Sequence, residues 1–558
     1  MFRLTVSLAL SAFAVSAAAR AAPTDPTPAE NNAVINAELP ADQAAMKSHV
    51  MFLASDAMRG REAGSPEFDI AAQYVASQFY EAGLRPAGDQ GGFLQKVPLV
   101  SYRPDGHGTF VIGRAGTAPL VLGFGEDFLP SANAAKALTT VSAPVVFVGE
   151  GITAPQFDRD DYKGVNVRGK IVAYFGSAPS AFPSEERAHF ASPATKSANA
   201  AAHGAIGTIT LESPVTAKSR PFARGAATFD RPRVTWAEAD GTGHSATPDT
   251  PSLGSLSLAG AAKLFEGART PWATIVKLAE VDGARFRPMR LATTLTAVFK
   301  TVSTPLPSSN VVGMIPGGDP KLKDQVVVLS AHLDHIGVGR PDAKGDTINN
   351  GALDDAVGMA SLIEEARRFK TSGKVPRRSI LFLAVTAEEK GLVGSDYFAH
   401  NPTVPGRSIV ADVNLDMPIL TYKFSDIMVY GAQRSTLGPI VQRAASAIGV
   451  TLSADPLPDE AIFVRSDHYR FVQQGVPSVF LWPGAGNGGQ AAIEAFMKDH
   501  YHQPSDEIGQ EPHIDWEQGV RFVDVNYRIA REIADGDQRP MWNKGDYFGT
   551  LYNGPGAK

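Results

Sequence analysis

The sequence predicts an α/β fold: a mixed, largely parallel sheet flanked by helices, with a β-rich block inserted before the main run of strands. Four continuous apolar runs are each long enough for one buried strand, namely residues 326–330, 379–385, 409–415 and 477–482. An amphipathic segment at 358–369 separates the first two runs, and a final helix is expected at 515–534, after the last run. Strands that alternate with helices along the chain favour a sheet with helices on both faces.

The chain before these strands is predicted to be first helical and then β-rich. Apolar residues recur at helical spacing from Phe68 to Phe79, and Gly83 is placed to end that helix. Residues 126–299 differ in character, because short β-prone pieces alternate there with loops rich in Pro, Gly and Ser. Within this block we expect strands at 143–148, 170–174 and 205–209 and a helix-compatible stretch at 197–202. The block is therefore expected to be an insertion with its own core.

Residues 1–22 are predicted to be a secretory signal peptide. Arg3 supplies a positive start, residues 4–15 form an apolar stretch too short to span a bilayer, and small residues surround the cleavage position near Ala21. The mature protein is expected to be exported, either to the periplasm or out of the cell. No later apolar run is long enough for a transmembrane helix, so no membrane partner is expected after cleavage.

The composition excludes several classes of function. The formal net charge of -6 leaves no basic excess to neutralise phosphates, so no nucleic acid partner is expected. The chain has no Cys, which excludes disulfides, a Cys nucleophile and any thiolate metal site. A serine hydrolase is not indicated either, because no Gly-x-Ser-x-Gly sequence occurs.

Acidic residues and histidines gather where the predicted strands end. The run 326–330 is followed by His332 and Asp334, the run 379–385 by Glu388 and Glu389, and the run 409–415 by Asp416. In open α/β sheets, sites form beyond the carboxyl ends of the strands. Two loop residues are expected at the same edge: Asp354, before the first helix, and His502, after the fourth strand.

This set of side chains is suited to zinc. Zinc binds imidazole nitrogens and carboxylate oxygens, and a catalytic site keeps one position open for water. The five candidate ligands are His332, Asp354, Glu389, Asp416 and His502. Five are too many for one tetrahedral catalytic zinc, whereas they suit two zinc ions that share a bridging carboxylate. One residue of the Glu388–Glu389 pair can bind metal while the other acts as a general base. Asp334 can support the second imidazole nitrogen of His332.

Six motifs in order carry a resemblance to a known family. They are His332-Leu333-Asp334, Gly351-Ala352-Leu353-Asp354-Asp355, residues 388–395, Asp416, Ser466-Asp467-His468 and residues 501–506. The chain resembles the co-catalytic di-zinc metallopeptidases (clan MH), which include bacterial leucine aminopeptidases, glutamate carboxypeptidase II and the transferrin receptor. Residues 161–172 and 196–206 are similar to a protease-associated (PA) domain, and residues 60–65 to the opening segment of the family.

The resemblance implies a zinc aminopeptidase-like fold of the phosphorylase/hydrolase type and a role for each candidate residue. Asp354 would bridge the two metals and form a cis peptide bond with Asp355. His332 and Asp416 would complete one site, Glu389 and His502 the other, and Glu388 would be the general base. The implied division is a signal peptide at 1–22, the N-terminal part of the peptidase domain at 23–125, the PA domain at 126–299, the di-zinc peptidase domain at 300–545 and a tail at 546–558.

The expected function is an exported zinc-dependent exopeptidase that hydrolyses N-terminal peptide bonds of a peptide or small protein with metal-activated water. A carboxypeptidase of the glutamate carboxypeptidase type, a glutaminyl cyclase and a non-catalytic binding protein are the alternatives. The last is disfavoured because all ligands and Glu388 are present. The oligomeric state is left open.

Other polar residues near the motifs are expected to have supporting roles. His335 is expected only to line the cleft, and Asp355 to start a helix. His468 is expected to be packed near the pocket, and His500 to lie in a surface loop. Arg340 and Arg465 are candidates for binding a substrate carboxylate, although a structural or solvated arginine is equally consistent with the sequence.

Overall fold

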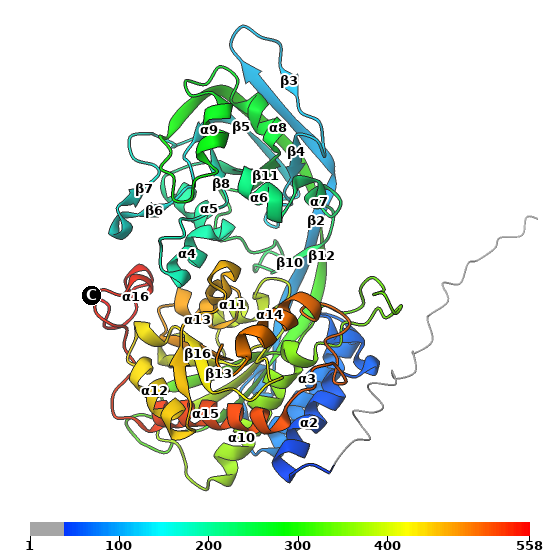
Figure 1. Ribbon diagram of the computed structural model, residues 1–558, viewed down its shortest axis with the longest axis vertical. Coiled ribbons are helices and arrows are strands. Elements are labelled where there is room, and N and C mark those ends of the chain that lie inside the picture. The colour runs from blue at the N-terminus through cyan, green and yellow to red at the C-terminus, as the bar shows by residue number, and fades with distance from the viewer. Residues whose placement is uncertain (1–37) are drawn as a thin grey trace, which may run out of the picture.

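The computed structural model describes residues 38–558 as two lobes joined by two long strands (Figure 1). The predicted signal peptide at 1–22 lies outside the described residues. Strands β2 (Leu94–Arg114) and β12 (Met289–Ile315) pair antiparallel and run from one lobe into the other. Because β12 pairs with β14 in the first lobe and with β5 in the second, both lobes belong to one continuous sheet.

The first lobe contains the predicted largely parallel sheet. Its central strands are β13 (Val326–His332), β14 (Ser379–Val385), β15 (Ile409–Asn414) and β18 (Ser478–Pro483). They lie in the order β18-β15-β13-β14 and are parallel to their neighbours. The antiparallel pairings of β12 with β14 and of β16 (Asp426–Tyr430) with β18 make the sheet mixed. Every residue of the four central strands is buried, which explains why they appear in the sequence as continuous apolar runs.

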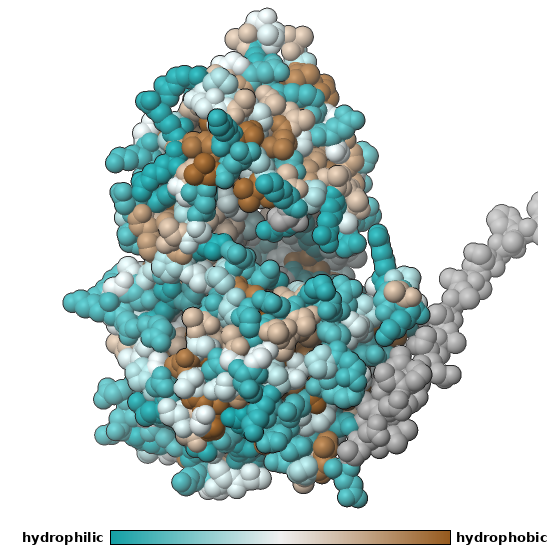
Figure 2. Space-filling model, viewed as in Figure 1, coloured by the Kyte–Doolittle hydropathy of each residue, from teal (hydrophilic) through white to brown (hydrophobic). Residues whose placement is uncertain are grey.

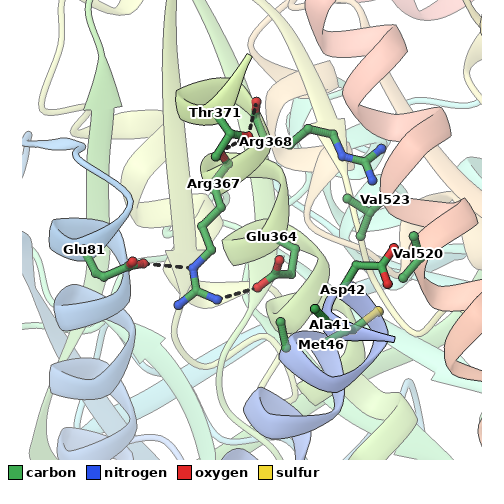
Figure 3. Close-up of a pocket in the computed structure, with 11 residues that line it drawn as sticks. Ala41, Asp42, Met46, Glu81, Glu364, Arg367, Arg368, Thr371, Val520 and Val523 are labelled. Carbon is green, nitrogen blue, oxygen red and sulfur yellow. Dashed lines mark hydrogen bonds and ion pairs between the residues drawn. The ribbon is translucent and has the colours of Figure 1, made fainter. Parts of the chain in front are cut away.

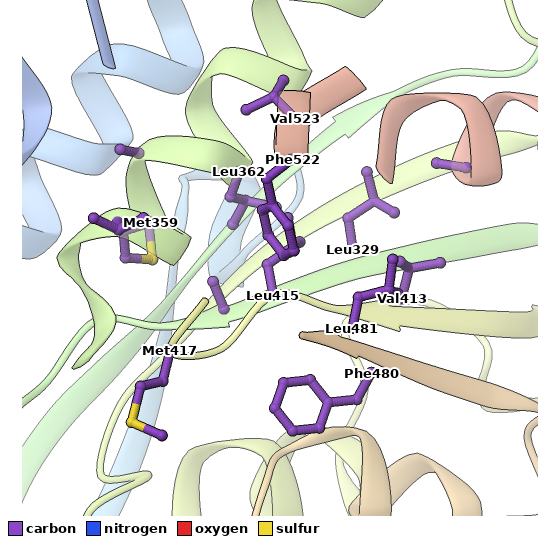
Figure 4. Packing of buried hydrophobic residues seen from close by; sticks show 14 of the residues in the cluster. Leu329, Met359, Leu362, Val413, Leu415, Met417, Phe480, Leu481, Phe522 and Val523 are labelled. Atoms are coloured by element: carbon purple, nitrogen blue, oxygen red, sulfur yellow. The ribbon is translucent and has the colours of Figure 1, made fainter. Parts of the chain in front are cut away.

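Helices cover both faces of this sheet. Val327 and Leu329 of β13 pack with α10 (Val357–Thr371) and α15 (Trp516–Asp535), whereas Val326 and Val328 pack with α11 (Val393–His400) and α13 (His468–Gln473). Figure 4 shows the first of these cores, in which Phe522 of α15 lies over the strands. Helices α2 (Ala41–Leu53) and α3 (Pro66–Glu81) pack beside α10. Helix α3 begins at the Ser65 cap and is followed by Gly83 at φ +77°, as its sequence predicts.

The second lobe has its own parallel strands and its own core. Strands β5 (Leu138–Phe147), β8 (Ile171–Phe175), β9 (Gly207–Leu211) and β11 (Ser252–Leu256) are parallel, and β4 (Phe128–Pro130) closes the edge antiparallel to β11. Phe147, Phe175, Leu256 and Phe299 belong to this core. Helices α4 (Ser184–Ala191) and α5 (Pro193–Ala202) follow β8. The strands expected at 143–148, 170–174 and 205–209 are therefore confirmed, with small shifts of their ends.

The strands that join the lobes were not predicted. Prolines interrupt both of them, including Pro98 and Pro307, which lie opposite one another in the pairing. Proline cannot donate a ladder hydrogen bond, so its presence argues against a strand. The far half of β2 belongs to the second lobe although it precedes residue 126, and β12 returns the chain to the first lobe.

The surface is polar over most of the face shown in Figure 2, with apolar side chains in small scattered groups. None of the helices described between residues 38 and 558 is both long enough and apolar enough to cross a membrane.

Candidate metal centre

The candidate ligands meet at the carboxyl edge of the parallel strands. His332 is the last residue of β13, Asp416 follows β15, and Glu388 and Glu389 follow β14. Asp354 precedes α10, and His502 lies in the turn after α14 (Gly489–Asp499). The prediction that these elements deliver their side chains to one place therefore agrees with the structure.

Two groups of donor atoms share Asp354. In the first group, His332 Nε2 lies 3.1 Å from Asp354 Oδ1 and 3.3 Å from Asp416 Oδ1. In the second, His502 Nε2 lies 3.4 Å from Asp354 Oδ2 and 3.0 Å from Glu389 Oε2. The two oxygens of Asp354 thus face different groups, as a bridging carboxylate must.

These donor sets fit zinc on their geometry. Around a tetrahedral zinc with bonds of about 2.0–2.2 Å, neighbouring donor atoms lie roughly 3.3 Å apart. The four nitrogen–oxygen distances above, 3.0 to 3.4 Å, match that spacing. His332, Asp354 and Asp416 offer ligand atoms that all lie within 4.8 Å of one another, so they could hold a metal ion.

His335 has a larger part in the site than its sequence context indicated. Its side chain is fully buried, and its Nδ1 lies 2.7 Å from Glu389 Oε1. His335, Asp354 and Glu389 form a second trio with the spacing of metal ligands. The signal in the sequence was its place directly after Asp334, but a lone histidine beside a motif does not show which way its ring points.

Local structure holds Asp354 in place. The carboxylate of Asp506 accepts hydrogen bonds from the main-chain N–H groups of Leu353 (2.9 Å) and Asp354 (3.0 Å). The Asp354–Asp355 peptide bond is cis, as the resemblance implies. Asp355 lies one residue before the N-cap of α10 and accepts from the N–H of Gly358 at 3.1 Å, so it lies close to the helix start expected for it.

Asp334 supports the site through different atoms than predicted. His332 Nδ1 lies 3.0 Å from the main-chain oxygen of Asp334, not from its carboxylate. The carboxylate accepts instead from the N–H of Glu388 at 3.0 Å. The expected contact between the Asp334 carboxylate and the ring is therefore wrong. The main-chain oxygen two residues on already satisfies that ring nitrogen, which leaves the carboxylate free to hold the Glu388 loop.

The charges of the site are unbalanced. Among residues 38–558, no Lys or Arg forms an ion pair with Asp354, Glu389 or Asp416. Burial raises the pKa of Glu388 well above its usual value, and nearby carboxylates add to this while His332 opposes it. Burial likewise raises the pKa of Asp334 to about 6. Divalent cations among these groups would stabilise their ionised forms.

Arg61 is a functional candidate that the sequence analysis did not single out. It is completely buried and donates hydrogen bonds to main-chain oxygens around the centre. The acceptors are Leu53 (3.1 Å), Leu333 (2.8 Å), Asn350 (2.5 Å), Gly351 (2.8 Å) and Asp354 (3.4 Å). It therefore ties the segment after β13 to the loop that carries Asp354. The available signal was its place in residues 60–65, the segment similar to the family's opening.

A narrow cavity of about 30 Å³ adjoins the donor groups. Its polar lining includes Glu388, Asp354, Asp416 and His502. The apolar lining consists of Met417, Ile462, Phe480, Trp482 and Met497. Arg465 and Tyr501 also line it, and Arg465 Nη2 donates to the Tyr501 hydroxyl at 3.0 Å. Glu388 thus lines a narrow space that has both charged and apolar lining groups.

His468 and His500 have the positions expected, whereas Arg340 is not placed to bind a substrate carboxylate in the cavity. His468 is fully buried near the cavity, against Phe463 and Phe480. His500 donates from Nδ1 to the main-chain oxygen of Ser505 at 2.9 Å, within its own turn. Arg340 is exposed and does not line the cavity.

A larger cavity of about 510 Å³ lies between α2, α10 and α15, away from the donor groups (Figure 3). Its arginines are already paired: Arg367 with Glu81 and Glu364, and Arg368 with Asp524. None of the candidate ligands lines it. The chemistry therefore points to the smaller cavity as the functional one.

The donor groups lie in a part of the chain that matches a known protein family. Residues 310–530 match the model of Peptidase family M28. The leupeptin-inactivating enzyme 1 of Streptomyces exfoliatus is 28% identical over 177 residues, which cover 32% of this chain and 36% of that protein. A probable leucine aminopeptidase 2 of Aspergillus oryzae is 26% identical over 272 residues, covering 45% and 51%. A probable glutamate carboxypeptidase of Arabidopsis thaliana is 29% identical over 258 residues, covering 43% and 33%. The chain thus spans about half the length, or less, of these relatives.

Solved structures that align with this chain include an aminopeptidase from Aneurinibacillus sp. strain AM-1. It has a TM-score of 0.47 and 21% identity, over 89% of this chain and 95% of that one. A zinc aminopeptidase from Bacillus subtilis has a TM-score of 0.42 and 19% identity, over 90% and 97%.

Proposed function

Residues 310–530 match the model of Peptidase family M28, and on that basis we propose that the protein is an exported, zinc-dependent exopeptidase that removes residues from the N-terminus of peptides. One observation carries the proposal: the two oxygens of Asp354 face two donor groups, and Glu388 lines the cavity beside them. The proposed ligands are those predicted from the sequence, with His332 and Asp416 in one group and Glu389 and His502 in the other.

The proposed reaction depends on where the chain's own groups lie. Two zinc ions held by these ligands would polarise the scissile carbonyl and lower the pKa of the attacking water. Glu388 is in position to accept a proton from that water and to deliver it to the leaving amine. The main-chain N–H of Glu388 is held by Asp334, so the base is attached to the same support as His332.

The substrate is proposed to be a peptide or small protein with an apolar residue at its N-terminus. The cavity beside Glu388 is narrow, and its apolar lining residues lie beside charged ones, which suits one terminal residue better than the middle of a chain. We further propose that the second lobe is a PA domain. Export is proposed because residues 1–22 have the sequence features of a secretory signal peptide.

Removal of C-terminal residues is the second candidate, because one cation lines the cavity. Arg465 has a planar guanidinium suited to a carboxylate. It is already engaged by Tyr501 and by the main-chain and side-chain oxygens of Glu460, so it is less free to bind substrate.

The deciding experiment is hydrolysis of a panel of aminoacyl-p-nitroanilides by the purified mature protein. The assay includes chelation, zinc restoration and a Glu388→Ala variant. We expect activity that disappears with the chelator, returns with zinc and is absent from the variant, together with two zinc ions per chain. If every α-amino substrate is inert while N-blocked peptides lose their C-terminal residue, the aminopeptidase proposal is replaced by the carboxypeptidase one.

A further inference from the structure

One wall of the substrate cavity is held by the lobe that contains none of the candidate ligands. Ile462, Arg465 and Ser466 line the cavity and belong to the loop 454–467, here called the wall loop, which connects β17 (Thr451–Ser453) to α13. Helix α4 of the second lobe packs against the two short turns of this loop, η7 (Pro458–Glu460) and η8 (Ile462–Val464). A contact between the lobes therefore lies directly behind the cavity wall.

The first connection is a set of hydrogen bonds at the start of the wall loop. Ser184, the first residue of α4, donates to Asp455 Oδ2 at 2.7 Å. The other oxygen of Asp455 accepts from the Tyr430 hydroxyl at 3.1 Å and from the N–H of Leu457 at 2.8 Å. Asp455 is thus held between the second lobe and the sheet of the first. The Arg187–Asp459 ion pair adds little, because Asp459 is 81% exposed.

The second connection is centred on Arg434, whose side chain is only 12% exposed. Its guanidinium pairs with carboxylates from two segments, namely Glu185 and Glu186 of α4 and Asp546 near the C-terminus. The pair with Glu186 is bidentate, at 2.9 and 2.6 Å. The same guanidinium lies 5.9 Å from the ring centre of Phe463, in the wall loop, and 4.7 Å from that of Phe548. Arg434 therefore links α4 to the residue next to Ile462.

The third connection lies at the far end of the wall loop. His189 of α4 and Tyr469 of α13 are both buried, and His189 Nδ1 lies 2.6 Å from the Tyr469 hydroxyl. The wall loop is thus attached to α4 near its beginning, in its middle and just beyond its end.

We propose that α4 and Arg434 of this inter-lobe contact determine which terminal side chain the cavity accepts, by holding the wall loop in place; the inference rests on the proposed exopeptidase function. The cavity of about 30 Å³ has room for about two water molecules. A bulky terminal side chain would therefore contact the cavity walls, and the position of the wall loop would decide how well it fits. Three of the cavity's lining residues move with the wall loop, so loosening its attachment selectively favours larger side chains. In this role Ser184 and Arg434 are positioning residues that do not touch substrate.

The test compares kcat/KM for alanine-, leucine- and phenylalanine-p-nitroanilide in the zinc-loaded full-length enzyme and its variants. Arg434→Met removes the ion pairs but keeps an apolar stem over Phe548, and Ser184→Ala removes one hydrogen bond. We expect the phenylalanine-to-alanine ratio to rise at least about threefold in Arg434→Met and less in Ser184→Ala, mainly through KM, because pocket fit sets such ratios. The matched control is Arg443→Met, on α12 (Leu437–Ala447). It removes an exposed ion pair with Glu532 of α15 and should leave the ratio unchanged.

Hydrogen exchange provides a readout that is independent of catalysis. Peptides covering residues 454–467 exchange faster in Arg434→Met than in the wild type or in Arg443→Met if α4 holds the wall loop. An unchanged substrate ratio, with or without faster exchange, overturns the proposal. Should Arg434→Met fail to fold, Ser184→Ala and His189→Phe carry the same comparison. A wild type inert on all three substrates refutes the proposed removal of N-terminal apolar residues instead, and the exchange data still decide whether α4 holds the loop.

Discussion

Both lobes place charged residues beyond parallel strands, but among the described residues the carboxylates of Asp354, Glu389 and Asp416 in the first lobe pair with histidines and with no Arg or Lys. In the second lobe, Glu150 follows β5, and its carboxylate pairs with Arg159 at 2.7 Å, while Asp161 pairs with the same guanidinium at 2.9 Å. Lys196 is buried beside them and donates to two main-chain oxygens. Two acids and two bases thus balance one another.

The first lobe differs because carboxylates from three strand ends converge without an Arg or Lys partner. Buried charges persist only when they are paired or bind a cation. Balanced charges therefore indicate a structural network, and unbalanced ones indicate a place for an added ion. The difference between the lobes separates a supporting site from a metal site without reference to any relative.

The largest effect is expected at the unbalanced site. Glu388→Gln keeps the shape of the side chain but cannot accept a proton, so kcat should fall about 10²–10⁴-fold. Zinc content, measured on the same preparation, should stay at the wild-type value, because Glu388 belongs to neither donor group. Loss of zinc along with activity would show that Glu388 is a ligand and that the assigned roles of the Glu388–Glu389 pair are reversed.

In the balanced network of the second lobe, a substitution should lower stability and leave zinc binding unchanged. Arg159→Met removes the ion-pair partner that buried Glu150 and Asp161 share, and loss of one partner of a buried pair typically costs about 3–5 kcal/mol of unfolding free energy. Because the network lies outside the metal centre, zinc affinity of the folded protein should not change. Denaturant unfolding and zinc titration of the same variant check the two statements. If the variant keeps the wild-type unfolding free energy but loses zinc affinity, the distinction between a structural network and a metal site is wrong.

The sequence could predict a feature where neighbouring residues specify it, but not where it depends on residues far apart in the chain. His332, Glu389 and Asp416 each follow a buried apolar run, so both the strand and the position of its ligand could be inferred from neighbouring residues. The contact of Arg434 with Glu186 joins positions 248 residues apart, and nothing near either residue indicates it. The long strands β2 and β12 were missed because their prolines contradict the usual strand pattern.

The same reasoning applies within the candidate site. The direction of the His335 ring and the use of the Asp334 main-chain oxygen depend on how the loop turns after β13. A motif specifies residue types at fixed spacings, but it does not specify which atom of a residue makes a contact. The ligand set could therefore be proposed from the sequence, whereas its supporting contacts could not.

A smaller effect is expected from the side chain that supports the unbalanced site. Arg61→Lys keeps the positive charge but loses the planar fork that reaches several main-chain oxygens at once. Changes to groups that support metal ligands commonly reduce metal affinity about 10–100-fold, and we expect a loss in that range. Competition with a chelator measures it. Arg340→Lys, in the exposed part of the loop between β13 and Asp354, is the matched control. Equal affinities in the two variants would assign Arg61 a purely structural role.

The smallest effect expected is a pH dependence of the contact between the lobes. Burial lowers the pKa of His189 to about 3, so the folded protein holds this ring neutral. The unfolded chain, with an ordinary histidine pKa of about 6.5, binds a proton first as the pH falls. This contribution to stability is therefore complete above about pH 6.5 and is lost between about 6.5 and 3, by at most about 1.4 kcal/mol per pH unit. Other buried groups titrate in the same range, so the test is a difference: the unfolding free energy of wild type minus that of His189→Phe should decline as the pH falls from 7 to 5. A difference independent of pH would mean that His189 becomes protonated without leaving Tyr469, and that the attachment of α4 to α13 tolerates charge.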